Sequence, residues 1–404
     1  MLEGLPLVFV LTGVALYTVL GGADLGAGFW QLVAARDANG EHVREYAHKS
    51  MAPVWEANHV WLIFVLTVFW TAYPTAFASI ASTLAIPLFI ALIGIVFRGA
   101  AYALRGGAAT PREAGRIDTI FALSSVLVPF ALGAAVGAIA TDRVPAGNAA
   151  GDMWSSWLNA TSIFIGVLAV ATSAYLAAVF LAADAAHDGQ RELEDAFRRR
   201  ALGSGVIAGA IAIAGVFVVE HDNHSLFHSL LSGRALPAVL VSALAGLATL
   251  GLVYRRRYEP ARYGAALAVA AITAGWALAR WPTILPGLTV HQAAAGHDTL
   301  VCVIVAVLAG GAVVFPALGL LFGLTLTGRF RATPVAVAHG GVAPGAGSGR
   351  LLTRVAVACL IAGIGLLTIA DAGWAHAVGV ASLLGFVVAA FVAIAVPATD
   401  DLQA

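Results

Sequence analysis

Charge is scarce in this sequence. Of its 404 residues, 11% are Asp, Glu, Lys or Arg and 60% are hydrophobic, whereas soluble domains carry about 25% charged residues. With a mean hydropathy of +0.89, the composition excludes both an ordinary soluble protein and a disordered one. Lysine occurs once, at Lys49, and the formal net charge is zero, so no basic surface for nucleic acid is expected.

Cysteine is almost missing as well. Cys302 and Cys359 are the two cysteines, too few for a disulfide framework or a cysteine-rich metal site. The first basic residue is Arg36, so the N-terminal apolar run lacks the positive segment of a signal peptide. We predict that this run is a permanent helix.

Long hydrophobic runs, by contrast, fill the chain. A helix needs about 20 mainly apolar residues to cross a bilayer, and the sequence offers about eleven candidate spans. They cover residues 5–35, 54–73, 77–104, 117–140, 157–183, 202–219, 235–253, 263–281, 298–326, 352–370 and 375–396. The sequence therefore predicts an all-α, polytopic transmembrane protein.

The basic residues predict the orientation of these spans. If the N-terminus lies outside, 19 of the 22 basic residues fall in cytoplasmic segments, and Arg143, Arg234 and Arg280 fall outside. Because cytoplasmic loops are enriched in Lys and Arg, the distribution favours an N-out, C-in topology. The longest loop, about 327–351, is a flexible Gly/Ala/Pro linker that precedes the last two spans.

The first span contains an aspartate in its interior. Asp24 lies ten residues before Ala34, which corresponds to about 15 Å of helix. Gly22 and Gly26 are four residues apart, a spacing that lets another helix approach closely, so Asp24 is expected to face protein. Intramembrane carboxylates generally mark a proton or ion pathway. The alternative is a carboxyl that only forms hydrogen bonds between helices.

A second cluster of polar and aromatic residues opens the second span. It consists of Trp55, Glu56, Asn58, His59 and Trp61, after Pro53. Glu56 and His59 are three residues apart and share a helix face, and they can relay protons because imidazole titrates near neutral pH. The alternative is structural: a carboxylate in the first turn stabilises the helix dipole, and the tryptophans anchor the membrane interface.

Arg98 lies inside the third span, about 10 Å from Arg105 at its end. Two interpretations stand open. The side chain snorkels to the interface, or it pairs with Glu56 on the same side of the membrane and tunes a proton entrance.

The histidines disfavour haem binding by this chain. Haem inside a bundle needs axial ligands, yet of eleven histidines only His59 clearly belongs to a span. His221, His224 and His228 fall in a predicted outside loop, where their spacing matches no specific metal site. We interpret this segment as a solvated loop and predict no metal site in the chain.

Three motifs together resemble subunit II of the cytochrome bd quinol oxidases, including the cyanide-insensitive branch. They are residues 22–28, 52–62 and 97–102 with Arg105, and a weaker similarity continues to about residue 330. Three departures stand out: Gly21 replaces the first acid of a frequent Asp-Gly-Phe-Asp, His59 stands where Glu or Gln is common, and His291-Gln292 replaces a frequent Trp-Asp pair.

The resemblance implies a particular organisation of the helices. They are two four-helix bundles, at 1–142 and 153–283, followed by a peripheral helix at 296–327. The linker 328–351 and an extra hairpin at 352–397 lie beyond the usual end of the family. It also implies a heterodimer with a haem-bearing subunit I, which holds two b-type haems and one d-type haem, whereas this subunit binds no cofactor directly. The extra hairpin either replaces a small single-helix accessory subunit or covers a lipid-facing surface of the partner.

The activity that the resemblance implies is oxidation of quinol coupled to reduction of O₂ to water, in a bacterial inner membrane. We expect this chain to be a subunit of that oxidoreductase without catalytic residues of its own. It would support the haem subunit and conduct cytoplasmic protons through Glu56, His59, Arg98 and Asp24. The alternatives are a proton- or ion-coupled secondary transporter and a purely structural scaffold for the haem subunit.

Overall fold

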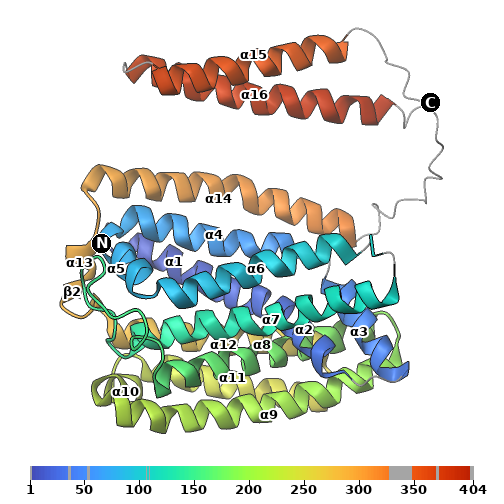
Figure 1. Ribbon diagram of the computed structural model, residues 1–404, viewed down its shortest axis with the longest axis vertical. Helices are drawn as coiled ribbons and strands as arrows, with labels where there is room; N and C mark the ends of the chain where they lie inside the picture. The colour runs from blue at the N-terminus through green and yellow to red at the C-terminus, as the bar shows by residue number, and fades with distance from the viewer. Residues whose placement is uncertain are drawn as a thin grey trace. The chain divides into compact units, whose positions relative to one another are not determined.

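The computed structural model describes residues 2–34, 38–51, 55–105, 107–108, 110–326, 348–369 and 373–400, nearly all of them in helices (Figure 1). The chain divides into two compact units, Met1–Leu318 and Gly319–Ala404. Within the first unit the long helices run roughly side by side. This arrangement is expected of a membrane protein, because helices that satisfy their own backbone hydrogen bonds can cross the bilayer together.

Eight helices in the described part of the chain are long and apolar enough to cross a membrane. They are Leu5–Val33, Ala85–Arg105, Arg112–Ala140, Ala160–His187, Arg191–Asp222, Leu236–Tyr254, Tyr258–Arg280 and His297–Ala317. Three shorter apolar helices are Asn58–Ala72, Arg354–Leu366 and Gly373–Phe386. The predicted all-α, polytopic membrane fold is confirmed, whereas the number of spans, the domain boundaries and the orientation stay predictions.

The first span is one long helix with a π-helical turn in its middle. It consists of α1 (Leu5–Leu16), the π-helix η1 (Tyr17–Gly21) and α2 (Gly22–Val33). The two halves have different neighbours, since α1 packs on α4 (Trp55–Ala72) and α12 (Tyr258–Arg280), and α2 packs on α7 (Pro111–Ala140) and α8 (Ala160–His187). A short helix, α3 (Ala38–Met51), follows α2 and packs against it.

The predicted third span, 77–104, was wrong as a single helix. The structure has α5 (Pro74–Thr83) and α6 (Ala85–Arg105), separated at Leu84. Pro87 explains the break, because its ring removes a backbone donor and clashes with the carbonyl four residues earlier, at Thr83. The long helix α6 then packs along α7.

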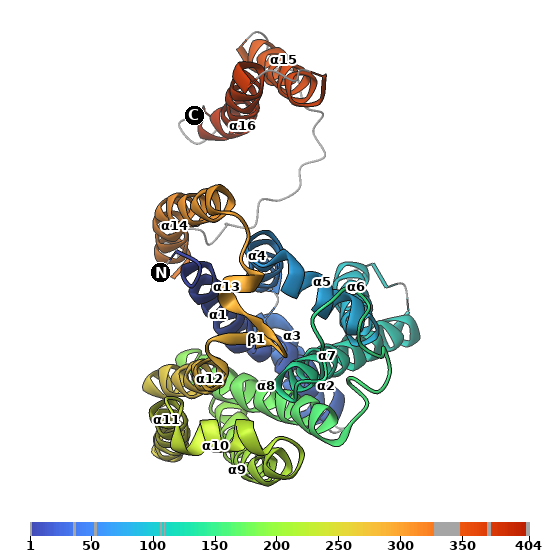
Figure 2. The same ribbon diagram turned by 90° about the vertical axis from the view of Figure 1, so that its left-hand side faces the viewer.

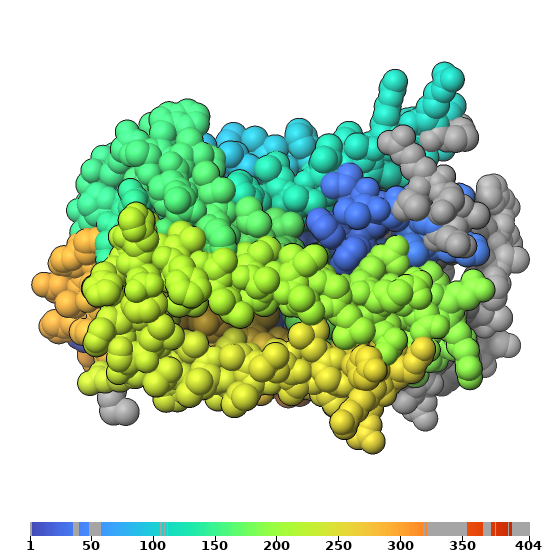
Figure 3. Space-filling model, turned by 90° about the horizontal axis from the view of Figure 1, so that it is seen from below, coloured from blue at the N-terminus to red at the C-terminus, as the bar shows by residue number. Residues whose placement is uncertain are grey.

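Helix α8 is the central helix of the first unit. It packs against α2, α7, α9 (Arg191–Asp222) and α12, and Leu176, Val179 and Leu181 on it are fully buried. Helices α10 (His224–Ser232) and α11 (Leu236–Tyr254) follow α9 in the chain. Figures 2 and 3 show α9 on the outside of the first unit.

The segment around His224 is helical, so its interpretation as a loop was wrong. Helix α9 continues to Asp222, which places His221 in its last turn, and α10 begins at His224 and includes His228. Asn223 separates the two helices, and its side chain caps α10 by accepting a hydrogen bond from the Leu226 amide at 3.0 Å.

A small hairpin connects α12 to α14 (His297–Leu326). Strands β1 (Thr283–Leu285) and β2 (Leu288–Thr289) pair antiparallel and lead into α13 (Val290–Ala293). The Ala295 amide then donates to the Ala72 carbonyl at 2.8 Å, so this connection is tied to the end of α4. In the second unit, α15 (Ser348–Ile369) and α16 (Gly373–Asp400) pack against each other.

Candidate functional site

The interior of α2 holds a fully buried carboxylate to which the sequence pointed. Asp24 has an exposed fraction of 0%, and its Oδ1 accepts a hydrogen bond from Arg98 Nη2 on α6 at 2.6 Å. Arg98 is 2% exposed and also donates to the Asp24 carbonyl at 3.3 Å. The two side chains therefore form an ion pair that is almost wholly removed from solvent.

Helix α7 completes the surroundings of the arginine. Arg98 Nε donates to Ser125 Oγ at 2.9 Å, and that hydroxyl donates to the Phe121 carbonyl at 2.7 Å. The guanidinium also lies over the Phe121 ring, 4.5 Å from its centroid, an arrangement that stabilises a desolvated cation. Residues from two other helices, α2 and α7, thus hold the charged end of Arg98 in one position.

Close helix packing brings these groups together. A Cβ on Gly26 would lie 1.9 Å from the Ser173 carbonyl oxygen of α8, and a Cβ on Gly22 would lie 3.3 Å from Leu176. A Cβ on Gly28 would lie 2.2 Å from Ser125 Oγ. Small residues at these positions let α2 approach both α7 and α8, as the spacing of the glycines predicts.

Arg98 does not follow the first of the two sequence interpretations, that its side chain snorkels to the interface. The Arg98 side chain is only 2% exposed. It does not reach the interface, because its guanidinium binds the buried Asp24 carboxylate instead. Asp24 is its carboxylate partner among the side chains that the structure describes. The side chains of Trp55 and Glu56 lie outside the described residues, so the expected pairing of Arg98 with Glu56 stays a prediction.

The π-helix lies directly before the aspartate. Such turns insert one extra residue and are frequent at functional sites. Asn58, 5% exposed on α4, donates from Nδ2 to the Leu20 carbonyl at 3.2 Å and so stabilises a backbone group of this turn. The cluster at the start of α4 is therefore joined to the first span next to Asp24.

Tyr17 is a residue of this site that the sequence analysis missed. Its ring fills the space beside Gly21, where a Cβ would lie 2.9 Å from the ring edge, and it contacts the His59 ring edge-to-face at 6.0 Å between centroids. The Tyr17 hydroxyl and Asp24 Oδ2 are both buried and have no hydrogen-bond partner among the described residues. A tyrosine one turn before a glycine pair in an apolar span was the available indication.

Trp61 and the histidines around α10 lie in surroundings that do not form a binding site within the described residues. Trp61 stacks on Phe315 of α14 at 6.4 Å between ring centroids, with 27° between their planes, so it packs between helices. Within the described residues, no group of three or more His, Cys, Asp and Glu side chains is placed to hold a metal ion, and this includes the three histidines around α10.

The chain is similar to proteins of one known family over most of its length. The model of one family, described as cytochrome bd terminal oxidase subunit II, matches residues 2–325. The chain is 30% identical to the cytochrome bd ubiquinol oxidase subunit 2 of Bacillus subtilis (strain 168) over 128 residues, 31% of this chain and 37% of that protein. A second protein of that bacterium, provisionally named cytochrome bd menaquinol oxidase subunit II, is 25% identical over 118 residues, 29% of this chain and 32% of its own length.

The chain therefore spans about a third of the length of these curated relatives. Among solved structures, it is similar to a chain in the structure of bd oxidase from Geobacillus thermodenitrificans. The TM-score is 0.64 and the identity 22%, over 81% of this chain and 99% of that chain. At this identity the likeness concerns the fold.

Proposed function

Because the chain belongs to the cytochrome bd terminal oxidase subunit II family, we propose that it works as the second subunit of a membrane complex that oxidises quinol and reduces O₂ to water. It is a multi-pass protein of a bacterial membrane. In this proposal the partner is a haem-bearing subunit I, which carries two b-type haems and one d-type haem and performs the electron chemistry.

The role of this chain is to support the partner and to conduct protons toward it. The observation that carries the proposal is the state of Asp24: one carboxylate oxygen is held by Arg98 at 2.6 Å, and the other is buried without a hydrogen-bond partner among the described residues. A carboxylate in such a place is expensive for a membrane protein. A proton pathway explains why a carboxylate is kept there, because its second oxygen can accept and release a proton.

The proposed order of residues along the pathway rests on their positions along the helices and on one ring contact. Glu56 and His59 share a face of α4 near its start, and the His59 ring meets Tyr17, which lies in η1 seven residues before Asp24. Protons would therefore pass from Glu56 and His59 by way of Tyr17 to Asp24. Arg98 would hold the Asp24 carboxylate in position on this route through its hydrogen bond to Oδ1.

The direct test is turnover of the purified complex. Asp24→Asn and Glu56→Gln remove groups that can change protonation state, so we expect each to slow quinol-driven O₂ consumption by about 100-fold, the size of a lost acid–base step. The haem spectrum of the complex should persist. Asp152→Asn, in a loop outside the described helices, serves as a control carboxylate. Normal turnover in both test variants would remove the proton role.

A second function is favoured by the ion pair itself. Asp24, Arg98 and Ser125 connect α2, α6 and α7, which is what a purely structural clamp requires. The double variant Asp24→Asn with Arg98→Gln separates the two functions, because it keeps hydrogen-bonding side chains and leaves no unpaired buried charge. A clamp predicts nearly normal turnover in this variant, whereas a proton pathway predicts that turnover stays slow.

A further inference from the structure

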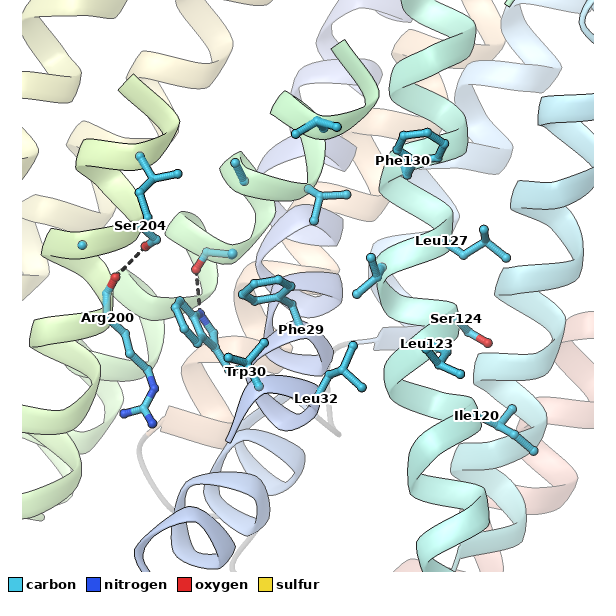
Figure 4. A pocket seen from close by; sticks show the side chains of 18 of the residues that line it. Phe29, Trp30, Leu32, Ile120, Leu123, Ser124, Leu127, Phe130, Arg200 and Ser204 are labelled. Atoms are coloured by element: carbon cyan, nitrogen blue, oxygen red, sulfur yellow. Dashed lines mark hydrogen bonds between the residues drawn. The ribbon is translucent and has the colours of Figure 1, made fainter. Parts of the chain in front are cut away.

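A long apolar groove lies on the first unit between α2, α7, α8 and α9. Its volume is about 1020 Å³, at the upper end of ligand sites, which span about 300–1,000 Å³. Figure 4 shows Phe29, Trp30 and Leu32 of α2 between Leu127 of α7 and Arg200 of α9. The polar side chains in its lining are Ser124, Arg200 and Ser204, and Ser204 is bonded to the Arg200 carbonyl at 2.6 Å.

The arginine marks the end of the groove nearest water. The first ten residues of α9, 191–200, contain seven charged side chains, whereas 201–219 contain none. Helix α7 changes in the same way, because 111–118 contains four charged residues and 119–140 none. The groove lining begins at Arg200 on α9 and at Ile120 on α7. Its charged end thus lies at the boundary of the hydrocarbon layer, and the rest lies within it.

Among the basic residues at this end, Arg256 binds carboxylates, whereas Arg198 and Arg200 bind backbone carbonyls. Arg256 binds Glu194 and Asp195 at 2.7 and 2.6 Å, which raises its pKa, and Arg198 donates to the Tyr254 carbonyl at 2.7 Å. The half-buried Arg200 donates to the Ala196 carbonyl of its own helix at 3.1 Å and lies near the Trp30 ring.

No carboxylate pairs with Arg200 among the residues that the structure describes. Its charge is therefore available to an anion from outside the chain, and a guanidinium binds phosphate with two parallel hydrogen bonds. A second positive charge lies at the same end, because the exposed Arg116 is one helical turn before Ile120 on the same face of α7.

We propose that this groove binds one anionic phospholipid. Its acyl chain lies between α2, α7 and α9, and its phosphate lies on Arg200. The apolar lining and the unmatched charge at the membrane boundary together select this ligand, because an amphiphile with an anionic head complements both parts of the site. A neutral isoprenoid quinone leaves the arginine without a partner.

The test uses the whole oxidase complex, washed in detergent and titrated with phosphatidylglycerol, with bound lipid counted by native mass spectrometry. Arg200→Gln is expected to weaken binding about tenfold or more, the size of a lost charged hydrogen bond. Gly203→Leu is expected to abolish binding, because Gly203 lines the groove and a leucine side chain there fills the acyl-chain site. The substitution should leave the helix undisturbed, since a Cβ at Gly203 meets nothing within 4 Å.

Two matched variants of α9 control these changes. Arg199→Gln removes the neighbouring exposed charge, and Gly209→Leu adds the same side chain at an open position outside the lining; both should bind phosphatidylglycerol as the wild type does. Equal binding by the wild type and Arg200→Gln overturns the proposal, as does equal loss in Arg199→Gln. Recovery of a quinone in place of phospholipid overturns it as well. Because bound lipid is the measurement, the outcome is independent of the proton pathway.

Discussion

Neutralising one member of the Asp24–Arg98 pair should harm the protein more than neutralising both. Either single variant, Asp24→Asn or Arg98→Gln, leaves the other charge in a site that is at most 2% exposed. The double variant leaves two neutral side chains that can still form a hydrogen bond. The effects of the two substitutions are therefore expected to be strongly non-additive.

The magnitude follows from burial and distance. Arg98 Nη2 and Asp24 Oδ1 are 2.6 Å apart, and for charge centres about 4 Å apart, Coulomb's law gives about 4 kcal/mol at an effective dielectric constant of 20. Removing one member of a buried pair costs about 3–5 kcal/mol, whereas replacing both members by well-packed apolar residues of similar volume is often nearly neutral. Asn and Gln at the two positions likewise leave no unpaired charge. The coupling free energy of the cycle should therefore be at least about 3 kcal/mol.

The assay is denaturant unfolding of the complex in mild detergent, followed by circular dichroism, for the wild type, both single variants and the double variant. Arg105 and Asp118 provide a matched cycle, because they pair at 2.5 Å but both side chains are 41% exposed. An exposed pair should show a coupling free energy below about 1 kcal/mol. Additive costs at Asp24 and Arg98, or equal coupling in the two cycles, would refute the reasoning.

Three further changes test other parts of the site. Tyr17→Phe should slow O₂ consumption about tenfold and leave the unfolding free energy unchanged, since the hydroxyl has no partner among the described residues; normal turnover would exclude Tyr17 from the pathway. Asn58→Ala should lower the unfolding free energy by about 1 kcal/mol by removing the hydrogen bond to the Leu20 carbonyl, and an unchanged unfolding curve would contradict this. Gly26→Val should lower the unfolding free energy by more than about 3 kcal/mol, because a Cβ there lies 1.9 Å from a backbone oxygen. Gly251→Ala, with open space around the Cβ, should leave the unfolding free energy unchanged or raise it. Similar losses of unfolding free energy at both glycines would be inconsistent with the packing described.

Much of the fold could be predicted from the sequence because each span is an uninterrupted apolar run, and membrane helices satisfy their own backbone. The break at Leu84 could not be seen in hydropathy, since Pro87 changes the backbone without reducing the apolar character of the run. Helix α10 was missed for the opposite reason. Its polar first residues, beginning at His224, look like a loop, and the capping role of Asn223 becomes apparent only with its hydrogen bond to Leu226.

The candidate site was predicted in part. The glycines beside Asp24 predicted that it faces protein, and the structure places it at 0% exposure. Its partner was not predicted, because Arg98 is 74 residues away and the choice between partners depends on how α2 is rotated about its axis. Tyr17 was missed for the same reason, since a pattern of residues does not reveal a π-helical turn.

That turn has a consequence for how the first span can evolve. Each residue of an α-helix advances by about 100° around the axis, so one added residue in 17–21 shifts every later side chain of the span by roughly a quarter of a turn. The half before it, α1, keeps its face toward α4 and α12, and α2 presents a different face to α7 and α8. The direction of Asp24 is therefore fixed by a count of residues. Deleting a single residue there would swing the carboxylate away from Arg98 while every side chain of the site remained in the sequence.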